Sequence, residues 1–349
     1  MNEYQGVIHL HSIFSDGTGE VEDIALTAQE VNLDFLVLTD HNTMRAKSEG
    51  FEKFYGKTFL LVGCEINDRE NRNHYLALGI SQTPSTRLPA HKYVDEVNKA
   101  GGIGFLAHPH EKRSSMPEHP PYPWTDWSTD EFTGIEIWNH MSVWMENLTE
   151  ENKYQSFLHP LRTVAHPPEE SLKLWDEISK RRKIVGIGGI DAHAHKIDLL
   201  GFFEVEVFPY KVLFKSIRTH ILTHEEIVAD NSTVGIKKAS DAIIESLRNG
   251  RCFVSNFSVA DARGFCFCAV SDAGEFQQGD VAPLSPDLIL KVALPGLSAT
   301  IRIIGNGEVV SEIEGEKLEY KVTLPGSYRV EIERNGRAWI YSNHIYVSN

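Results

Sequence analysis

The sequence predicts an α/β barrel followed by a smaller all-β domain. Up to about residue 255, apolar runs of strand length alternate with helical stretches, and about seven such units imply a parallel sheet closed into a barrel. Beyond that point the helical pattern stops, and short alternating runs rich in β-branched residues take its place. A length of 349 residues suits one large and one small domain, which we place at residues 1–256 and 257–349.

The predicted barrel strands are apolar runs that end at polar residues. In chain order they are GVIHLHS, DFLVLTDH, TFLLVGCEIN, HYLALGI, GIGFLAHPH, GIEIWNH and KIVGIGGIDAH. Four helical stretches accompany them, and cap and stop residues indicate their ends. These are residues 22–31 with Thr18 as N-cap, residues 91–102 ending at Gly101 and Gly102, residues 167–183 with Pro168 in the first turn, and residues 239–250 with Ser240 as cap and Gly250 as stop.

The C-terminal part carries hairpin signals between its alternating runs. Asn306-Gly307 and Asn335-Gly336 each separate two such runs, and Asn-Gly is the strongest short-range signal for a β-hairpin. Leu324-Pro325-Gly326 marks a further turn. We therefore expect a small β-sandwich of about 90 residues.

Composition excludes several classes of protein. A net charge of −15 gives no electrostatic footprint for nucleic acid, so we expect none as the main partner. Apolar runs stay far below the ~18 residues of a membrane span. The start, MNEYQGVIHLHS, has neither a basic n-region nor an apolar h-region, so we expect a cytoplasmic protein and leave a clipped leader open. Four scattered cysteines do not suggest a disulfide framework.

Histidines and carboxylates recur where the predicted strands end. In His9-x-His11 both imidazoles would project from the same face of one strand, although two surface histidines would give the same local pattern. Later strand ends and their flanking loops repeat this chemistry. The residues concerned are Asp16, Asp40, His41, Glu65, His74, His108, Asp191 and His193. Because the carboxyl ends of barrel strands converge on one face, we expect these side chains to meet there.

The types of side chain indicate a site for metal ions. Imidazole together with carboxylate suits zinc, manganese or iron. The carboxylates of Asp16, Glu65 and Asp191 would repel one another without compensating charge, which two or three divalent cations would supply. Such a site favours an anionic substrate or transition state. A water bridging two cations would lose its proton near neutral pH and act as the nucleophile.

The succession of motifs resembles the PHP (polymerase and histidinol phosphatase) superfamily over roughly residues 6–255. The motifs are H-L-H-S-x-x-S-D-G, L-T-D-H-N-T, G-C-E-I-N, A-H-P and D-A-H. The resemblance implies a distorted (β/α)7 barrel with a trinuclear metal site. It also implies three ligand sets: His9, His11, Glu65 and Asp191; Glu65, His74 and His108; and Asp16, His41 and His193.

A looser set of motifs resembles stand-alone members with a C-terminal β-domain, which include predicted phosphoesterases and carbaryl-type carbamate hydrolases. The motifs are I-E-I-W-N, L-W-D, G-I-G-G-I-D-A-H, G-R-C-F-V-S and S-N-H-I-Y-V. The leading hypothesis is a phosphoesterase acting on a small phosphomonoester or diester. The alternative is a carbamate, ester or amide hydrolase with the same metals. A metal-stabilised binding module and an exonuclease are less favoured, and the sequence leaves the oligomeric state open.

Three residues are candidates for catalysis beside the metals. Asp40 would orient an imidazole or cap its strand, and His195 would protonate the leaving group or face solvent. Arg251 would bind phosphate or serve a structural role. Further basic residues that could hold phosphate are Arg45, Lys112, Arg113 and Lys196. His110, His119 and His140 are expected to have no ligand role.

An aromatic stretch follows the His108 motif. Residues 120–127 include Trp124 and Trp127, and Trp138 and Trp144 come after them. This stretch would form a hydrophobic wall over the site, or pack in the core of an irregular loop. In the first case the substrate would carry an apolar or ring-shaped leaving group. In either case we expect the substrate to be a small anionic or aryl ester.

Overall fold

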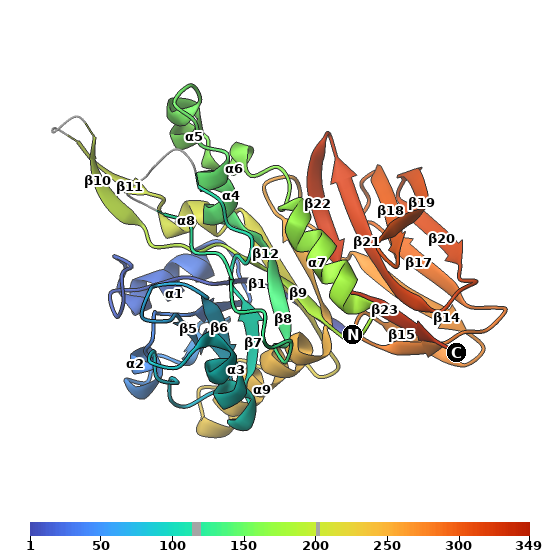
Figure 1. Cartoon of the computed structure of the whole chain (residues 1–349), viewed down its shortest axis with the longest axis horizontal. Coiled ribbons are helices and arrows are strands. Elements are labelled where there is room, and N and C mark those ends of the chain that lie inside the picture. The colour runs from blue at the N-terminus through green and yellow to red at the C-terminus, as the bar shows by residue number, and fades with distance from the viewer. Residues whose placement is uncertain (114–119, 200–202) are drawn as a thin grey trace.

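The computed structural model describes residues 1–113, 120–199 and 203–349, which form a mixed α/β part and a C-terminal β part (Figure 1). All the described helices lie before residue 250. They are α1 (Val21–Glu30), α2 (Arg45–Ser48), α3 (Ala90–Lys99), α4 (His140–Glu146), α5 (Lys153–Leu158), α6 (Pro160–Thr163), α7 (Glu169–Ser179), α8 (Tyr210–Leu213) and α9 (Thr233–Asn249). No helix in these ranges is long and apolar enough to cross a membrane.

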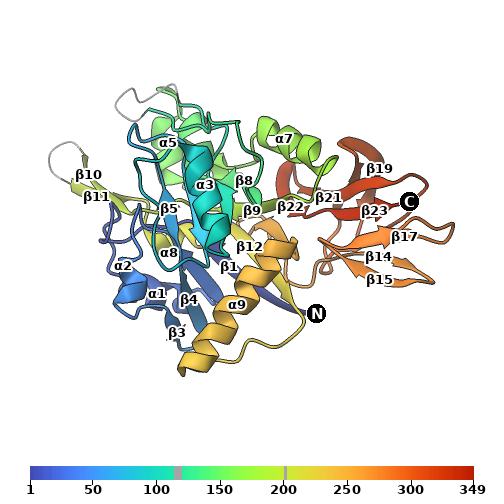
Figure 2. The same cartoon turned by 60° about the horizontal axis from the view of Figure 1, so that its bottom comes forward.

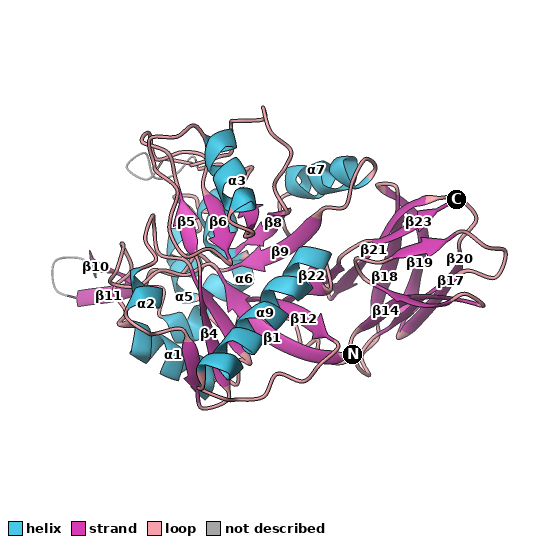
Figure 3. Cartoon of the chain, turned by 90° about the horizontal axis from the view of Figure 1, so that it is seen from below, coloured by secondary structure: helices cyan, strands magenta, loops and turns pink. Residues whose placement is uncertain are grey.

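The first sheet of the N-terminal part mixes parallel and antiparallel strands. Its members here are β1 (Asn2–Ile8), β2 (Phe35–Leu38), β3 (Lys53–Tyr55), β4 (Thr58–Val62), β12 (Ile217–Thr223) and β13 (Cys252–Asn256). β1, β2 and β4 run parallel, whereas β3, β12 and β13 are antiparallel to their neighbours. Helix α9 packs against β12 on one face of this sheet (Figure 3).

A second sheet lies beside the first. It contains β5 (Cys64–Ile66), β6 (Tyr75–Leu78), β7 (Ile103–Leu106), β8 (Gly134–Asn139) and β9 (Val185–Gly189). Only β6 runs against its neighbours. The strands thus lie in two sheets, and no closed all-parallel barrel is present in the described ranges. The connection from β5 to β6 contains no helix, and β12 pairs antiparallel with β13 although α9 lies between them in the chain. The apolar runs alone could not reveal these antiparallel pairings.

The helix ends agree only in part with those predicted from the sequence. Gly250 ends α9 with φ 72°, as predicted. Ser240 does not cap this helix: α9 begins two turns earlier, where the Ser232 hydroxyl accepts the Gly235 N–H at 3.1 Å. Thr18 does not cap α1 either, because its hydroxyl donates to the Ala194 carbonyl at 2.7 Å. Local cap patterns therefore indicated the helices but misplaced two of their starts.

The C-terminal part contains only strands among its regular elements. These are β14 (Cys266–Ser271), β15 (Gly274–Gln277), β16 (Val281–Pro283), β17 (Ile289–Ala293), β18 (Ala299–Gly305), β19 (Glu308–Gly315), β20 (Lys317–Lys321), β21 (Gly326–Arg334), β22 (Arg337–Ser342) and β23 (Ile345–Ser348). Asn306-Gly307 and Asn335-Gly336 form the predicted two-residue hairpins, with positive φ at all four residues. Four of these strands, β14, β15, β17 and β20, form a separate sheet.

The two parts share a sheet although they have separate cores. β13 pairs with β12 on one side and with β22 on the other, so hydrogen bonding continues across the predicted boundary at residue 256. A hydrophobic cluster from Phe253 to Val347 lies apart from the cluster that surrounds the N-terminal strands. Figure 2 shows α7 alongside the C-terminal strands at this junction. The junction is therefore bonded through the main chain as well as packed.

Candidate metal centre

The predicted metal ligands converge at the strand ends. His9 and His11 follow β1 and both are completely buried. We had expected both residues to lie on a regular strand, but β1 ends at Ile8 and His9 has φ 69°. Asp191 also has positive φ, at 53°. A non-glycine residue adopts this conformation at an energetic cost, which packing around it must offset.

Glu65 occupies the middle of the cluster. It follows β4 at the second residue of β5 and is 1% exposed. Its two carboxylate oxygens face five imidazoles. The distances are 3.0 Å to His9 Nε2, 3.1 Å to His11 Nε2, 3.5 Å to His41 Nδ1, 2.7 Å to His74 Nδ1 and 3.4 Å to His108 Nε2. A carboxylate in this position can bridge neighbouring cations.

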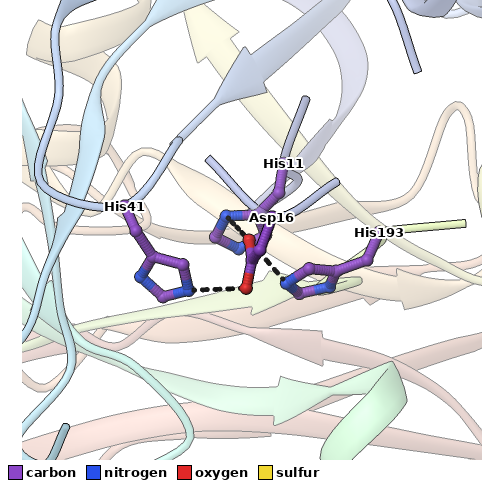
Figure 4. A group of neighbouring side chains, drawn as sticks. All are labelled: His11, Asp16, His41 and His193. Carbon is purple, nitrogen blue, oxygen red and sulfur yellow. Dashed lines mark ion pairs between the residues drawn. The ribbon is translucent and has the colours of Figure 1, made fainter. Parts of the chain in front are cut away.

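Asp16 forms a second centre at the mouth of the cluster. Its carboxylate lies 3.7 Å from His11 Nδ1, 3.6 Å from His41 Nε2 and 3.3 Å from His193 Nε2 (Figure 4). The Asp16 side chain is 50% exposed, whereas Glu65 is buried. The cluster therefore has a solvent-facing end and a buried end.

The side chains fall into three groups that could each hold an ion. The groups are His9, His11, Glu65 and Asp191; His41, Glu65 and His74; and His11, Asp16, His41 and His193. The first group is the set that the resemblance implied. The second has His41 where His108 was expected, although His108 still lies 3.4 Å from Glu65. The third gains His11.

Unpaired nitrogens and local charge both fit a bound cation. Within the described ranges, buried ring nitrogens of four cluster histidines lack hydrogen-bond partners. These are Nδ1 and Nε2 of His11, Nδ1 of His41, Nε2 of His74 and Nδ1 of His108. A buried polar atom without a partner is costly, and metal ligation would remove that cost. The donor set also matches the preferences of zinc, manganese and iron.

The electrostatics of the cluster point the same way. Burial by itself raises the pKa of Glu65, but the charges of His9, His41 and His74 bring it well below its ordinary value. Burial lowers the pKa of His41 to about 4, against the attraction of Glu65. Burial also lowers the pKa of His11 and of His108, but neighbouring carboxylates raise both to about 9, so cations that bind here would displace protons from these imidazoles.

Glu136 was missed by the sequence analysis. This residue of β8 is 1% exposed, and its Oε1 lies 2.9 Å from His9 Nδ1. Its Oε2 accepts the His108 N–H at 2.8 Å and the Asn139 side-chain amide at 2.9 Å. By engaging His9 Nδ1 it leaves Nε2 turned toward Glu65. One acidic residue within the apolar run GIEIWN was the available signal.

Asp40 does not contact an imidazole, so its predicted orienting role is wrong. Its carboxylate accepts hydrogen bonds from the Ser12 N–H, the Ser12 hydroxyl and the Ser15 hydroxyl, each at 2.7 Å. These bonds fix the loop that carries Asp16. Asp40 therefore positions the loop that carries Asp16 rather than an imidazole ring.

A cavity of about 490 Å³ opens onto the cluster. Asp16, Glu65 and His193 are among the ligand-type residues on its wall, and His195 stacks on His193 with ring centroids 4.9 Å apart. Of the predicted basic residues, Arg113 and Lys196 line it. Arg113 is held by Glu111 at 2.6 Å and Lys196 by Glu204 at 2.9 Å.

The other predicted basic residues lie elsewhere. Arg251 faces Asp280 at 3.4 Å near the helix stop at Gly250, so its predicted role in the site is wrong. Arg45 of α2 pairs with Glu49, and Lys112 pairs with Glu170 of α7. Neither Arg45 nor Lys112 lines the cavity. Sequence proximity to a motif was misleading because each of these side chains finds a nearer carboxylate.

Only some residues of the predicted aromatic wall lie at the cavity. Trp124 is buried against Tyr75 and Tyr93, and Trp127 is half exposed beside His110. Neither lines the cavity, so these two residues form no part of a wall over the site, whereas Trp144 of the same prediction does line it. Tyr122 does line it and stacks on His74, with centroids 5.2 Å apart.

The structure describes two of the three remaining histidines. His110 Nδ1 lies 3.0 Å from the Ser171 hydroxyl, and His140 is completely buried. His119 lies outside the described residues.

Comparison with known proteins agrees with the motifs. The family model of the PHP domain matches residues 8–101. No curated protein matches the chain. A two-domain Bacteroides vulgatus protein containing a predicted PHP-like metal-dependent phosphoesterase is 15% identical, covering 99% of this chain and 95% of its own, with a TM-score of 0.47.

Two further solved structures cover about half of the chain. A Bifidobacterium adolescentis protein, named by prediction as a metal-dependent phosphoesterase, is 18% identical, covering 54% of this chain and 87% of its own, with a TM-score of 0.35. An amidohydrolase from Chromobacterium violaceum with bound sulfate and no metal is 14% identical, covering 56% and 91%, with a TM-score of 0.32. Residues 8–101, which contain His9, His11, Asp16, His41, Glu65 and His74, are thus the part of the chain that is similar to the PHP domain family.

Proposed function

We propose that the protein is a metal-dependent phosphoesterase that hydrolyses a small phosphomonoester or diester. The observation that carries the proposal is the cluster of histidines and carboxylates around Glu65, placed at the wall of a cavity that also contains Arg113 and Lys196. Cationic side chains beside a metal cluster suit an anionic substrate.

The proposed ligands are His9, His11, Asp16, His41, Glu65, His74, His108, Asp191 and His193. Two or three divalent ions of zinc, manganese or iron would lower the pKa of a coordinated water and offset charge on the attacked phosphoryl group. Glu65 would hold neighbouring ions together, and Glu136 would fix the orientation of His9. His195 would donate the proton to the leaving group from its place beside His193.

We also propose that the N-terminal strands form a distorted seven-stranded barrel in a domain of residues 1–256. Support comes from main-chain bonds between the two sheets: the Asp191 N–H donates to the His9 carbonyl at 2.7 Å, and the His11 N–H donates to the Ala192 carbonyl at 2.9 Å. A sandwich of residues 257–349 would complete the chain.

A panel assay on metal-quantified enzyme tests the hydrolase proposal. Nitrophenyl phosphate, bis(nitrophenyl) phosphate and naphthyl carbamate are compared after loading with zinc, manganese or iron. We expect metal-dependent phosphoester hydrolysis that is lost in His11→Ala and Asp191→Ala. Turnover of none of the three, or turnover unaffected by both substitutions, would reject the proposal.

The alternative is hydrolysis of a carbamate, ester or amide at the same cluster. One observation favours it, because apolar side chains form much of the cavity wall. Preference for the naphthyl carbamate over both phosphates would support this alternative.

A further inference from the structure

We propose that the site selects an ester whose non-phosphate part is apolar and ring-sized, held by a prebuilt hydrophobic wall. This inference rests on the proposed phosphoesterase function. The wall consists of Met141, Trp144 and Met145 on α4, Phe157 on α5 and Val207 at the end of β11 (Phe203–Val207), all of which line the cavity of about 490 Å³.

The wall forms because α4 presents one face to the cavity. Met141, Trp144 and Met145 are three and four positions apart, so they share a face of this helix. Trp144 and Met145 are nearly buried, whereas Met141 and Phe157 are only partly buried. Partly buried apolar side chains that line a cavity leave surface free for a ligand, which core packing alone would not require.

Aromatic contacts hold the wall in place before any ligand arrives. The Trp144 ring meets Phe157 and Phe208 edge to face, with centroids 5.0 Å apart in both pairs. The Trp144 Nε1–H donates to the Ser156 carbonyl at 3.1 Å, which joins α4 to α5. These contacts fix the side chains, so a ligand does not have to order them.

The wall is also fixed relative to the metal cluster. Asn139 caps α4 by accepting the Ser142 N–H at 2.9 Å, and its amide donates to Glu136 at 2.9 Å. Glu136 in turn bonds His9. One residue therefore ties the apolar helix to the ligand-bearing strand ends, so the reacting group and the apolar group of one substrate can be recognised together.

The polar side of the cavity limits where the apolar group can lie. Arg113 and Lys196 are the basic residues on the wall, while Asp16, His41 and Glu65 belong to the cluster. A phosphate would be held between cluster and cations, and its ester substituent would extend toward α4 and α5. We expect little preference for charged or sugar-like substituents, because their hydroxyl groups would lose water against Met141 and Phe157.

The test compares naphthylmethyl phosphate with methyl phosphate as substrates, because both release a primary alcohol, and naphthylmethyl phosphonate with methylphosphonate as non-hydrolysable ligands. We expect kcat/KM to favour the naphthylmethyl ester by at least about tenfold, in line with the discrimination that apolar pockets achieve. Binding of the phosphonates, followed by calorimetry and by tryptophan fluorescence, should show the same order.

Phe157→Ala and Met141→Gln should each lower kcat/KM far more for the naphthylmethyl ester than for methyl phosphate, and so remove most of this preference. Leu158→Ala is the matched control, because its side chain is 72% exposed on the same helix. Far-UV circular dichroism verifies folding, and agreement between the two cavity variants guards against a folding artefact in one of them.

The outcomes separate this inference from the proposed function. Phosphoester hydrolysis with equal efficiency for both esters would overturn the apolar selection and leave the hydrolase proposal standing. Absence of hydrolysis, together with naphthylmethyl phosphonate binding that Phe157→Ala weakens, would support the apolar wall and reject the phosphoesterase. Absence of both would reject both.

Discussion

Arg329 and Asp176 join the two parts of the molecule through a bidentate ion pair. Arg329 Nε and Nη2 each lie 2.7 Å from a different oxygen of the Asp176 carboxylate. Asp176 belongs to α7 and Arg329 to β21, and both side chains are more than nine-tenths buried. The paired geometry satisfies both groups at a place where neither could be solvated.

Removal of one partner should therefore be costly. We expect Asp176→Asn to lower the free energy of unfolding by about 3 kcal/mol, because it leaves the guanidinium buried with one fewer ionic partner. Urea titration measures the change. Lys180→Ala, which breaks the exposed pair with Glu177, is the control and should leave the free energy of unfolding nearly unchanged. Equal losses in both variants would contradict the importance of burial.

The same ion pair should make the free energy of unfolding depend on pH in the acid range. Burial by itself raises the pKa of Asp176, but hydrogen bonds from Arg329 and His344 lower it from 3.8 to about 2. A depressed carboxyl pKa stabilises the fold above 3.8, and that contribution is lost as the pH falls toward 2, because the unfolded chain takes up the proton first. We expect the stability difference between wild type and Asp176→Asn to shrink by about 2 kcal/mol between pH 5 and pH 2. A constant difference would refute the assignment.

Glu136 should control the metal centre through His9. Replacement by Gln keeps the shape but weakens the contact with His9 Nδ1, and we expect metal affinity and kcat to fall by about 10- to 100-fold. Metal content by elemental analysis separates this effect from a direct loss of chemistry. Glu131→Gln, on the exposed approach to the same strand, should behave as wild type. Full metal occupancy together with normal kcat in Glu136→Gln would disprove the positioning role.

Because Gly189 has no side chain, the Glu136 carboxylate can lie against its backbone. A Cβ built at Gly189 would lie 1.7 Å from Glu136 Oε1 and 3.0 Å from His9 Cβ, so Gly189→Ala must displace one of them. We expect loss of metal binding and a clear drop in melting temperature, measured by elemental analysis and calorimetry. Gly315→Ala is the control, because its added methyl would make only an ordinary contact of 3.6 Å with Ile313. Normal metal binding in Gly189→Ala would show that the Glu136 contact is dispensable.

The ligand cluster was predictable because its signal is local and repeated. Each of His41, Glu65 and Asp191 follows an apolar strand, and the strand ends of an α/β fold converge. The positive φ of His9 and Asp191 was not predictable, because neighbouring strands impose it. The clustering of these side chains was therefore predictable from the sequence. Their division into three groups required the three-dimensional structure.

The partners of the residues around the cluster were harder to predict than the cluster itself. Asp40 and Arg251 each had several partners within reach, and only folding decides which is nearest. Trp124 and Trp144 have the same character in sequence, yet Trp124 packs away from the cavity and Trp144 lines it. The burial of an aromatic side chain does not reveal which side of it remains free.

The pairing of β13 with β22 bears on how this chain could be shortened. Phe253, Val254 and Ser255 lie opposite Ser342, Tyr341 and Ile340, so a chain ending at residue 256 would expose an unpaired strand edge. An open, apolar edge is a template for association with other chains. The C-terminal strands therefore act as an edge protector, and an N-terminal fragment would self-associate unless another strand took the place of β22.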